Sequence, residues 1–167
     1  MVTDLVQIQR MGEKQRDENL RFRTWLKRHN FVERRFKAIA QETEDRVDCT
    51  TCANCCRVAT TQINQRDIER LARFLGVKPQ QFLRDYTEQS EDEGIILRRT
   101  GDGCIFLDGM LCSVYEGRPE TCQHFPHLVK GNGSLLSRMW HMPDRAVYCP
   151  IVFNTLETFK QETGFKK

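Results

Sequence analysis

The stretch Cys49-Thr-Thr-Cys-Ala-Asn-Cys-Cys56 places four thiols within eight residues. Loops this short let consecutive sulfurs turn toward one ion or cluster. Four clustered thiols add little to packing, whereas metal-bound thiolates order loops that have few other reasons to be ordered. The stretch therefore predicts a metal or metal-cluster site that organises the fold around it.

Four further cysteines lie downstream of this stretch. The first residues carry no secretory signal, so we expect a cytoplasmic, reducing environment, in which many cysteines indicate metal binding or redox chemistry before a disulfide framework. The candidate metal ligands are therefore Cys49, Cys52, Cys55, Cys56, Cys104, Cys112, Cys122 and Cys149. If they form two sites, we expect one of Cys49, Cys52, Cys55 and Cys149, and one of Cys56, Cys104, Cys112 and Cys122.

The residues leave the identity of the metal open. Structural zinc takes four tetrahedral thiolates, and eight cysteines suffice for two such sites. Iron-sulfur clusters also use four cysteines, and Cys49-x2-Cys52-x2-Cys55 with a remote Cys149-Pro150 is similar to the bacterial ferredoxin run. We expect an iron-sulfur cluster or iron, with zinc as the alternative. Cycling of metal-free thiols is a third hypothesis, which the strain of a vicinal Cys55-Cys56 disulfide disfavours.

Composition limits the remaining classes. The chain has 167 residues, 39% hydrophobic and 29% charged, which is enough for one domain with a real core. No apolar run approaches the roughly 20 residues that a membrane-spanning helix needs, so we expect no membrane partner. A net charge of +3 is too small to indicate nucleic acid by itself.

Residues 1–47 contain no cysteine or proline, and their one glycine is Gly12. Apolar residues at spacings of three and four predict one amphipathic helix over about 20–42. Eight basic and three acidic residues lie between Arg16 and Lys37. We interpret this arm as an apolar stripe packed on the cysteine domain with a solvated basic back. Its alternative role is to engage a protein or nucleic-acid partner.

Local signals predict two helices after the first cysteine cluster. Asn64 is a typical N-cap with Asp67 three residues on, and Gly76 is a typical C-terminal stop. Pro79 suits the first turn of the next helix. The pair superficially resembles a helix-turn-helix motif, but the second helix offers only Arg84 as a basic residue, so nucleic-acid binding is disfavoured.

The segment from Cys104 to Cys112 predicts a β-hairpin with Asp108-Gly109 at its tip. If both thiols serve one site, a three-residue loop of residues 107–109 would place Cys104 directly opposite Cys112. Residues 94–99 have the composition of a strand. A terminal helix is expected from Pro150 to near Gly164.

Together these elements predict a small α+β fold, mainly helical, organised around a cysteine-bound metal centre. We expect an N-terminal helical arm over residues 1–47 and a metal-binding domain with a short hairpin and a C-terminal helix over residues 48–167. The sequence specifies no oligomeric state, no substrate and no catalytic reaction.

The cysteine run, together with motifs downstream of it, resembles the YkgJ-type CxxCxxCC family over about residues 49–150. The matching motifs are Asp67-Ile68, Leu75-Gly76, Gly103-Cys-Ile-Phe-Leu107, Cys112-Ser-Val-Tyr-Glu116, Arg118-Pro119-x2-Cys122 and Phe125-Pro126. The resemblance implies zinc or iron chelation. Through flagellin lysine methylases, which are more distantly similar and associated with an iron-sulfur cluster, it also implies protein modification, with a protein as partner or substrate.

The sequence departs from the family pattern at two positions. Ala53 stands where the family usually has Gly, a change that we expect to matter little if the backbone angles are ordinary. Gln123 stands where Arg often follows the cysteine, which removes one possible anion contact. Methyl transfer is not carried over, because the chain shows no glycine-rich nucleotide loop after a strand.

Beyond the cysteines, the segment Tyr115, Glu116 and Arg118 lies between two candidate ligands. Arg118 could donate to sulfur or bind an acidic substrate, and Glu116 could act as an acid or base. We favour a structural role, in which Glu116 and Arg118 form an ion pair that braces the loop. His124 and His127 follow Cys122 but are more typical of surface or core residues than of ligands.

Overall fold

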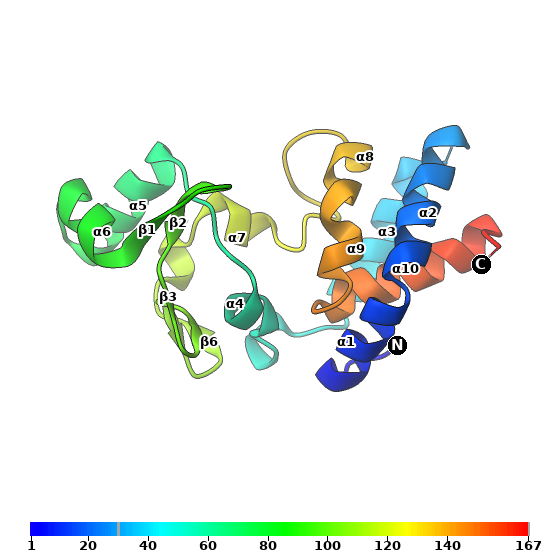
Figure 1. Ribbon diagram of the computed structural model, residues 1–167, viewed down its shortest axis with the longest axis horizontal. Helices are drawn as coiled ribbons and strands as arrows, with labels where there is room; N and C mark the ends of the chain where they lie inside the picture. The colour runs from blue at the N-terminus through cyan, green and yellow to red at the C-terminus, as the bar shows by residue number, and fades with distance from the viewer. Residues whose placement is uncertain (30, 167) are drawn as a thin grey trace. The chain divides into compact units, whose positions relative to one another are not determined.

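The computed structural model describes residues 1–29 and 31–166 (Figure 1). The chain divides into two compact units. The first, called the helical unit, joins Met1–Asp48 to the segment that begins at Phe125. The second, called the cysteine unit, comprises Cys49–His124. In this division the C-terminal segment packs with the N-terminal helices. The expected division into domains 1–47 and 48–167 stays a prediction.

The helical unit is built around its C-terminal helix, α10 (Figure 1). Its elements are α1 (Leu5–Lys14), α2 (Arg16–Arg28), α3 (Glu33–Glu44), α8 (Leu135–Arg138), η3 (Met139–His141), α9 (Met142–Arg145) and α10 (Pro150–Thr163). Helix α10 packs against α1, α3 and α9. The terminal helix is confirmed, with Pro150 in its first turn and Gly164 at its end in the left-handed conformation, φ 68°.

The prediction of one helix over residues 20–42 is wrong. Helix α2 ends at Arg28, and both His29 and Val32 have extended backbone angles. The break lets Phe22 from α2 and Phe36 from α3 both contact Phe159, with ring centroids 6.0 and 5.1 Å away. Each half keeps apolar residues at spacings of three and four, so the pattern marked the buried faces and could not show the break.

The cysteine unit combines short helices with three small antiparallel sheets. The helices are η1 (Cys49–Thr51), α4 (Asn54–Val58), α5 (Gln65–Leu75), α6 (Pro79–Tyr86), η2 (Tyr115–Gly117) and α7 (Glu120–His124). The sheets pair β1 (Thr87–Ser90) with β2 (Gly94–Leu97), β3 (Arg99–Thr100) with β4 (Gly103–Cys104), and β5 (Leu107–Asp108) with β6 (Leu111–Cys112). The α+β, mainly helical fold class is thus confirmed.

Local signals place the two helices after the cysteine run as expected. Asn64 and Asp67 form the reciprocal capping box at the start of α5, and Gly76 ends it with φ 69°. The core of this unit is small and centres on Phe82, whose ring lies 5.4 Å from Tyr86 and 6.4 Å from Phe106. Across residues 1–29 and 31–166, no helix has the length and apolar character needed to span a bilayer.

Candidate metal centre

The two hairpins that carry Cys104 and Cys112 differ from the predicted geometry. Cys112 pairs with Leu107 and Cys104 pairs with Arg99, so the expected three-residue loop with Cys104 opposite Cys112 is wrong. The loop between β5 and β6 consists of Gly109 and Met110, and Gly109 has φ 60°. Glycine at the first position of a two-residue loop is typical of a type II′ turn, which fixes this register.

A close backbone approach brings Cys104 beside the first cysteine cluster. A Cβ atom on Gly103 would lie 2.5 Å from the carbonyl oxygen of Cys56 and 2.8 Å from Cα of Arg57. Gly103 also has φ 129°, a conformation that other residues rarely adopt. Only glycine therefore allows β4 to lie against α4, and this contact sets the position of Cys104 relative to Cys56.

Four thiols from four different elements lie near one another: Cys56, Cys104, Cys112 and Cys122. Burial, with smaller contributions from the other three thiols, raises the pKa of Cys122 to about 12. Burial likewise raises the pKa of Cys104 and of Cys112, with Cys56 contributing in the same direction. Because each thiolate disfavours its neighbours, the cluster favours a cation that would neutralise them together.

Cys56 differs from the other three. Its sulfur lies 3.9 Å from that of Cys55, and the hydrogen bond between them lowers the pKa of Cys56 to about 7. Arg57 and Arg118 lower it as well. Arg99 similarly favours the thiolate of Cys104. The four-thiol group is therefore accompanied by three guanidinium groups.

Two of these arginines are held by backbone carbonyls rather than by carboxylates. Arg57 donates to the carbonyls of Cys52 at 2.9 Å and Gly109 at 2.8 Å, which joins the first cysteine run to the β5–β6 hairpin. Arg99 donates to the carbonyls of Ala59 and Arg57. Among the described residues no acidic side chain forms an ion pair with either guanidinium group.

Arg118 has a different partner from the one predicted. Its guanidinium lies 3.8 Å from the centroid of the Tyr115 ring, a cation–π contact. In the described structure Arg118 forms no ion pair with Glu116, so the expected brace between them is wrong. The stacking instead holds the positive charge of Arg118 near Cys56 and Cys112, whose thiolates it favours.

The residues that position α7, and with it Cys122, were not found from the sequence. Asp67 is 2% exposed and accepts a hydrogen bond from the backbone N–H of Glu120 at 3.0 Å. Arg70 pairs with Asp67 and donates to the carbonyl of Arg118 at 3.0 Å. A sequence signal exists: α7 follows Pro119 without a typical N-cap residue, so its first N–H groups need an acceptor from elsewhere.

The remaining cysteines occupy other surroundings. Cys49 is exposed in η1, and Cys52 is partly buried after it. Cys149 belongs to the helical unit, where it is 5% exposed in the core at the start of α10. The assignment of Cys49, Cys52, Cys55 and Cys149 to a common site stays a prediction.

Ala53 does not have ordinary backbone angles. It adopts the left-handed conformation, with φ 49° and ψ 12°, and is 5% exposed at the start of α4. This conformation costs an alanine about 1–2 kcal/mol relative to the right-handed one, and glycine much less. The departure from the family glycine therefore introduces strain between Cys52 and Cys55.

The donor set suits a thiophilic metal, although the thiols are not preassembled around one. All eight cysteines are thiols in the described structure. Among the described side chains, no three Cys, His, Asp or Glu residues are grouped closely enough to form a ready coordination sphere. Soft thiolates are ligands for zinc, iron and iron-sulfur clusters, and the three nearby arginines offset their charge. Metal binding by Cys56, Cys104, Cys112 and Cys122 would therefore require their side chains to move.

Comparison with known proteins identifies the family to which this chain belongs. A model named CxxCxxCC, described as a "putative zinc- or iron-chelating domain", matches residues 48–150. The chain is also similar to the uncharacterized protein MJ0661 of Methanocaldococcus jannaschii, with 30% identity over 90 residues, which is 52% of this chain and 48% of the relative. The chain thus spans about half the length of that relative. No solved structure matches it. The family match supports metal binding within residues 48–150.

Proposed function

Since the chain belongs to the CxxCxxCC family of zinc- or iron-chelating domains, which covers residues 48–150, we propose that its cysteine unit holds an iron-bearing centre. This centre is an iron-sulfur cluster or iron, with zinc as the alternative. Its proposed role is electron transfer or support of a protein modification, with a protein as partner or substrate.

One observation carries this proposal: the thiols of Cys56, Cys104, Cys112 and Cys122 are near enough to alter one another's ionisation although they come from four elements. Four cysteine side chains brought together from separate elements are a soft donor set that suits a thiophilic metal, which would bind them as thiolates in place of their protons. These four residues are therefore the proposed ligands. Cys49, Cys52, Cys55 and Cys149 are the further candidates, for the same centre or a second one.

An iron-sulfur centre, when bound, supplies one-electron redox chemistry. The chain's own residues would set its environment. Arg57, Arg99 and Arg118 offset the charge of the thiolates, and guanidinium groups near the sulfurs favour the more negative, reduced state. All four proposed ligands are partly exposed rather than fully buried, so the centre would lie close enough to the surface for exchange with another molecule.

The test is to purify the chain without oxygen or added metal and measure iron, zinc, acid-labile sulfide and the visible spectrum. We expect iron with sulfide, and colour that is lost in air. A Cys122→Ser variant should lose most of the metal. Ser113→Ala, which changes a neighbour of Cys112 that donates to the carbonyl of Phe106, serves as the control and should retain it. Unchanged metal content in Cys122→Ser would contradict the proposed ligand set.

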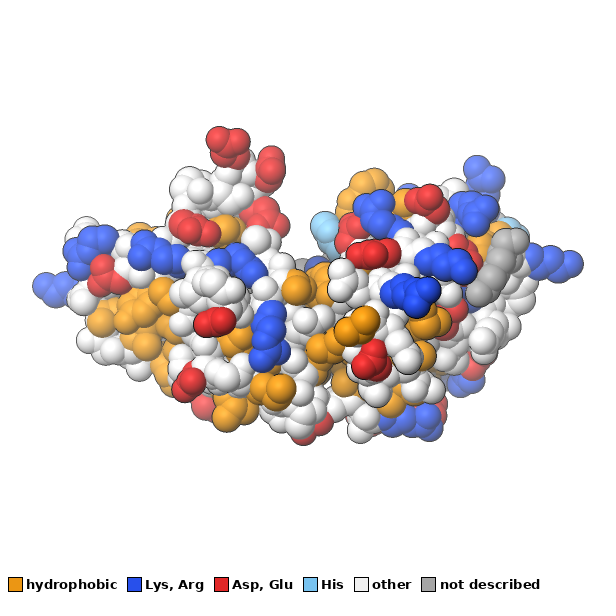
Figure 2. Space-filling model, turned by 60° about the horizontal axis from the view of Figure 1, so that its bottom comes forward, with side chains coloured by type: hydrophobic (Ala, Val, Ile, Leu, Met, Phe, Trp, Pro, Cys, Tyr) orange, Lys and Arg blue, Asp and Glu red, His pale blue; other side chains and the backbone are white. Residues whose placement is uncertain are grey.

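The second candidate function is a zinc-stabilised binding module, in which the metal fixes the fold and the N-terminal basic residues engage a partner. Zinc without colour or sulfide would favour it. Figure 2 shows basic and acidic side chains interspersed on the face that it draws, in keeping with a net charge of only +3. Nucleic acid is therefore disfavoured as the partner, because its binding depends on a concentrated basic surface.

A further inference from the structure

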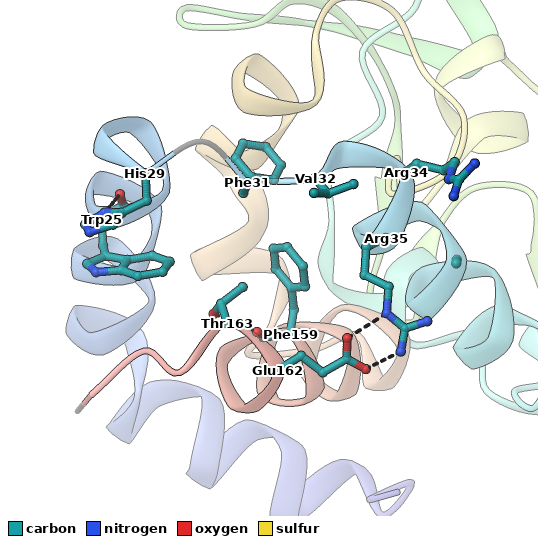
Figure 3. A pocket seen from close by; sticks show the side chains of 10 residues that line it. Trp25, His29, Phe31, Val32, Arg34, Arg35, Phe159, Glu162 and Thr163 are labelled. Atoms are coloured by element: carbon teal, nitrogen blue, oxygen red, sulfur yellow. Dashed lines mark hydrogen bonds and ion pairs between the residues drawn. The ribbon is translucent and has the colours of Figure 1, made fainter.

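The helical unit contains a pocket that has no part in the metal centre (Figure 3). It opens where α2 gives way to α3, and α10 forms its base, with a cavity volume of about 610 Å³. Binding pockets for organic ligands have volumes of about 300–1,000 Å³, so this one has room for one or two large side chains.

The interior of the pocket is aromatic. Phe159 is 2% exposed and lies at the base, with its ring 6.1 Å from that of Phe31 in an edge-on arrangement. Trp25 forms the opposite wall, and Val32, 62% exposed, stands at the mouth. A large exposed aliphatic side chain beside an aromatic cavity indicates an apolar surface whose burial by a binding partner is favourable.

Among the described residues, the lining of the pocket carries one unpaired positive charge, that of Arg34. Arg35 makes a bidentate ion pair with Glu162 at 2.6 and 2.7 Å, so these two side chains largely cancel (Figure 3). Arg34 also lines the pocket, and Lys27 and Arg28 lie on the last turn of α2 directly before it. In the described part of the chain Arg34 forms no ion pair, so it brings one unpaired positive charge to the lining, while Lys27 and Arg28 lie outside the lining residues.

We propose that this pocket is a docking site for an acidic peptide segment of a partner protein, which inserts one large apolar side chain. The aromatic interior would take that side chain, and Arg34 in the lining would attract a flanking carboxylate, with Lys27 and Arg28 on the preceding helical turn adding positive charge outside the lining. This mode is independent of the metal centre and does not rest on the identity of the metal.

The geometry favours a peptide over nucleic acid. Single strands are bound by exposed rings on which successive bases stack. Trp25 already stacks on His29 at 4.0 Å between ring centroids, and on Phe22 at 6.1 Å. Phe159 is recessed. The rings thus form the walls of a cavity for one side chain rather than a row of open platforms.

The chain allows a direct optical test. It has two tryptophans, Trp25 in the pocket and Trp140, which is 61% exposed beneath Arg23. A Trp140→Phe variant of the full chain keeps Trp25 as the reporter. The probe is a blocked five-residue peptide with one phenylalanine between two pairs of acidic residues. We expect a saturable change in Trp25 emission that weakens as salt is raised.

Three variants in this background define the site. Arg34→Glu should weaken binding by about tenfold, because it reverses a charge at the edge of the pocket. Arg21→Glu makes the same change of net charge at an exposed α2 position outside the lining residues and should change affinity less than about twofold. Ala38→Leu, at an exposed α3 position that lines the pocket, should fill it and abolish binding. Far-ultraviolet circular dichroism checks that each variant is folded.

Several results would overturn the proposal. These are an emission change that does not saturate, equal binding of a peptide with alanine in place of phenylalanine, and equal weakening by Arg21→Glu and Arg34→Glu. Three other possible occupants of the pocket are tested with the same Trp25 reporter. Tighter binding of a twelve-nucleotide single strand would assign the surface to nucleic acid, equal binding of phenylacetate would assign it to a small carboxylate, and self-association that is lost in Ala38→Leu would assign it to a second copy of the chain.

Discussion

The two units of this chain are stabilised in different ways. The helical unit has a continuous core of large side chains, in which Phe22, Phe36 and Phe159 are almost fully buried. The cysteine unit has a smaller core around Phe82, and two of its three sheets pair strands of only two residues. Apolar burial supports the first unit, whereas the second has short elements that need another constraint. A metal bound by thiols from several of these elements would supply it.

Removing the metal should have the largest effect on stability, and it should destabilise the cysteine unit but not the helical unit. Structural zinc contributes on the order of 10 kcal/mol in small cysteine domains, which exceeds the stability expected for a unit of this size. We expect chelator and reductant to abolish amide protection across Cys49–His124 while α2, α3 and α10 stay protected. Hydrogen exchange of the full chain, measured by mass spectrometry with and without metal, reports the protection of each unit separately. Equal protection of both units after metal removal would show that the contrast is wrong.

Phe159→Ala should affect the opposite unit. Its ring contacts those of Phe22, Phe31 and Phe36, so truncation leaves a cavity and costs about 4 kcal/mol. We expect a large fall in the melting temperature of the helical unit, while the metal content of the folded protein is retained. Val6→Ala, at a position 75% exposed on α1, is the control and should change stability little. Loss of metal in Phe159→Ala would show that the units are coupled.

Asp67→Asn should weaken metal binding without touching a ligand. The carboxylate accepts from the first N–H of α7 and pairs with Arg70, which in turn holds the Arg118 carbonyl. Losing the charge should cost about 2 kcal/mol and loosen the position of Cys122. Competition with a chromophoric zinc chelator measures the affinity.

Glu69→Gln is the matched control for Asp67→Asn, because Glu69 lies on the same helix and interacts with Gln65 at an exposed position. Its affinity for zinc should equal that of the wild type. If Asp67→Asn also binds as the wild type does, then α7 is positioned by its other contacts. A loss of affinity shared by both variants would indicate a general effect of charge on α5 instead.

The sequence predicted those features that depend on neighbouring residues. The capping box of Asn64 and Asp67 and the glycine end of α5 are completed within a few positions, so their signals are contained in the local sequence. The break between α2 and α3 is different, because it is favoured by the packing of Phe22 and Phe36 on a helix more than 100 residues away. Apolar spacing does not contain that information.

The candidate site shows the same division. Residue type was enough to nominate the cysteines, but their arrangement depends on contacts that no spacing encodes. The approach of Gly103 to Cys56 and the bond from Glu120 to Asp67 join residues 47 and 53 positions apart. The hairpin register was mispredicted because the turn consists of Gly109 and Met110 and leaves Asp108 paired in β5, whereas the prediction placed Asp108 in the loop; the register decides the face that each cysteine occupies.

Ala53→Gly gives the smallest and most local test of the contrast. The left-handed conformation at φ 49° strains an alanine by about 1–2 kcal/mol, and loss of its buried methyl group offsets about 0.8 kcal/mol of the relief. We therefore expect the cysteine unit to gain about 0.5 kcal/mol, seen as a small rise in its denaturant midpoint.

The reverse change at Gly76, which has φ 69° and open space around it, should lower the midpoint. Gly76→Ala introduces the same strain without any new contact, at a cost of about 1 kcal/mol. Opposite shifts from the two substitutions would show that the backbone angle, rather than packing, limits the loop between Cys52 and Cys55. If Ala53→Gly is destabilising, burial of the methyl group outweighs the strain. The cysteine loop would then depend on packing in the same way as the helical unit.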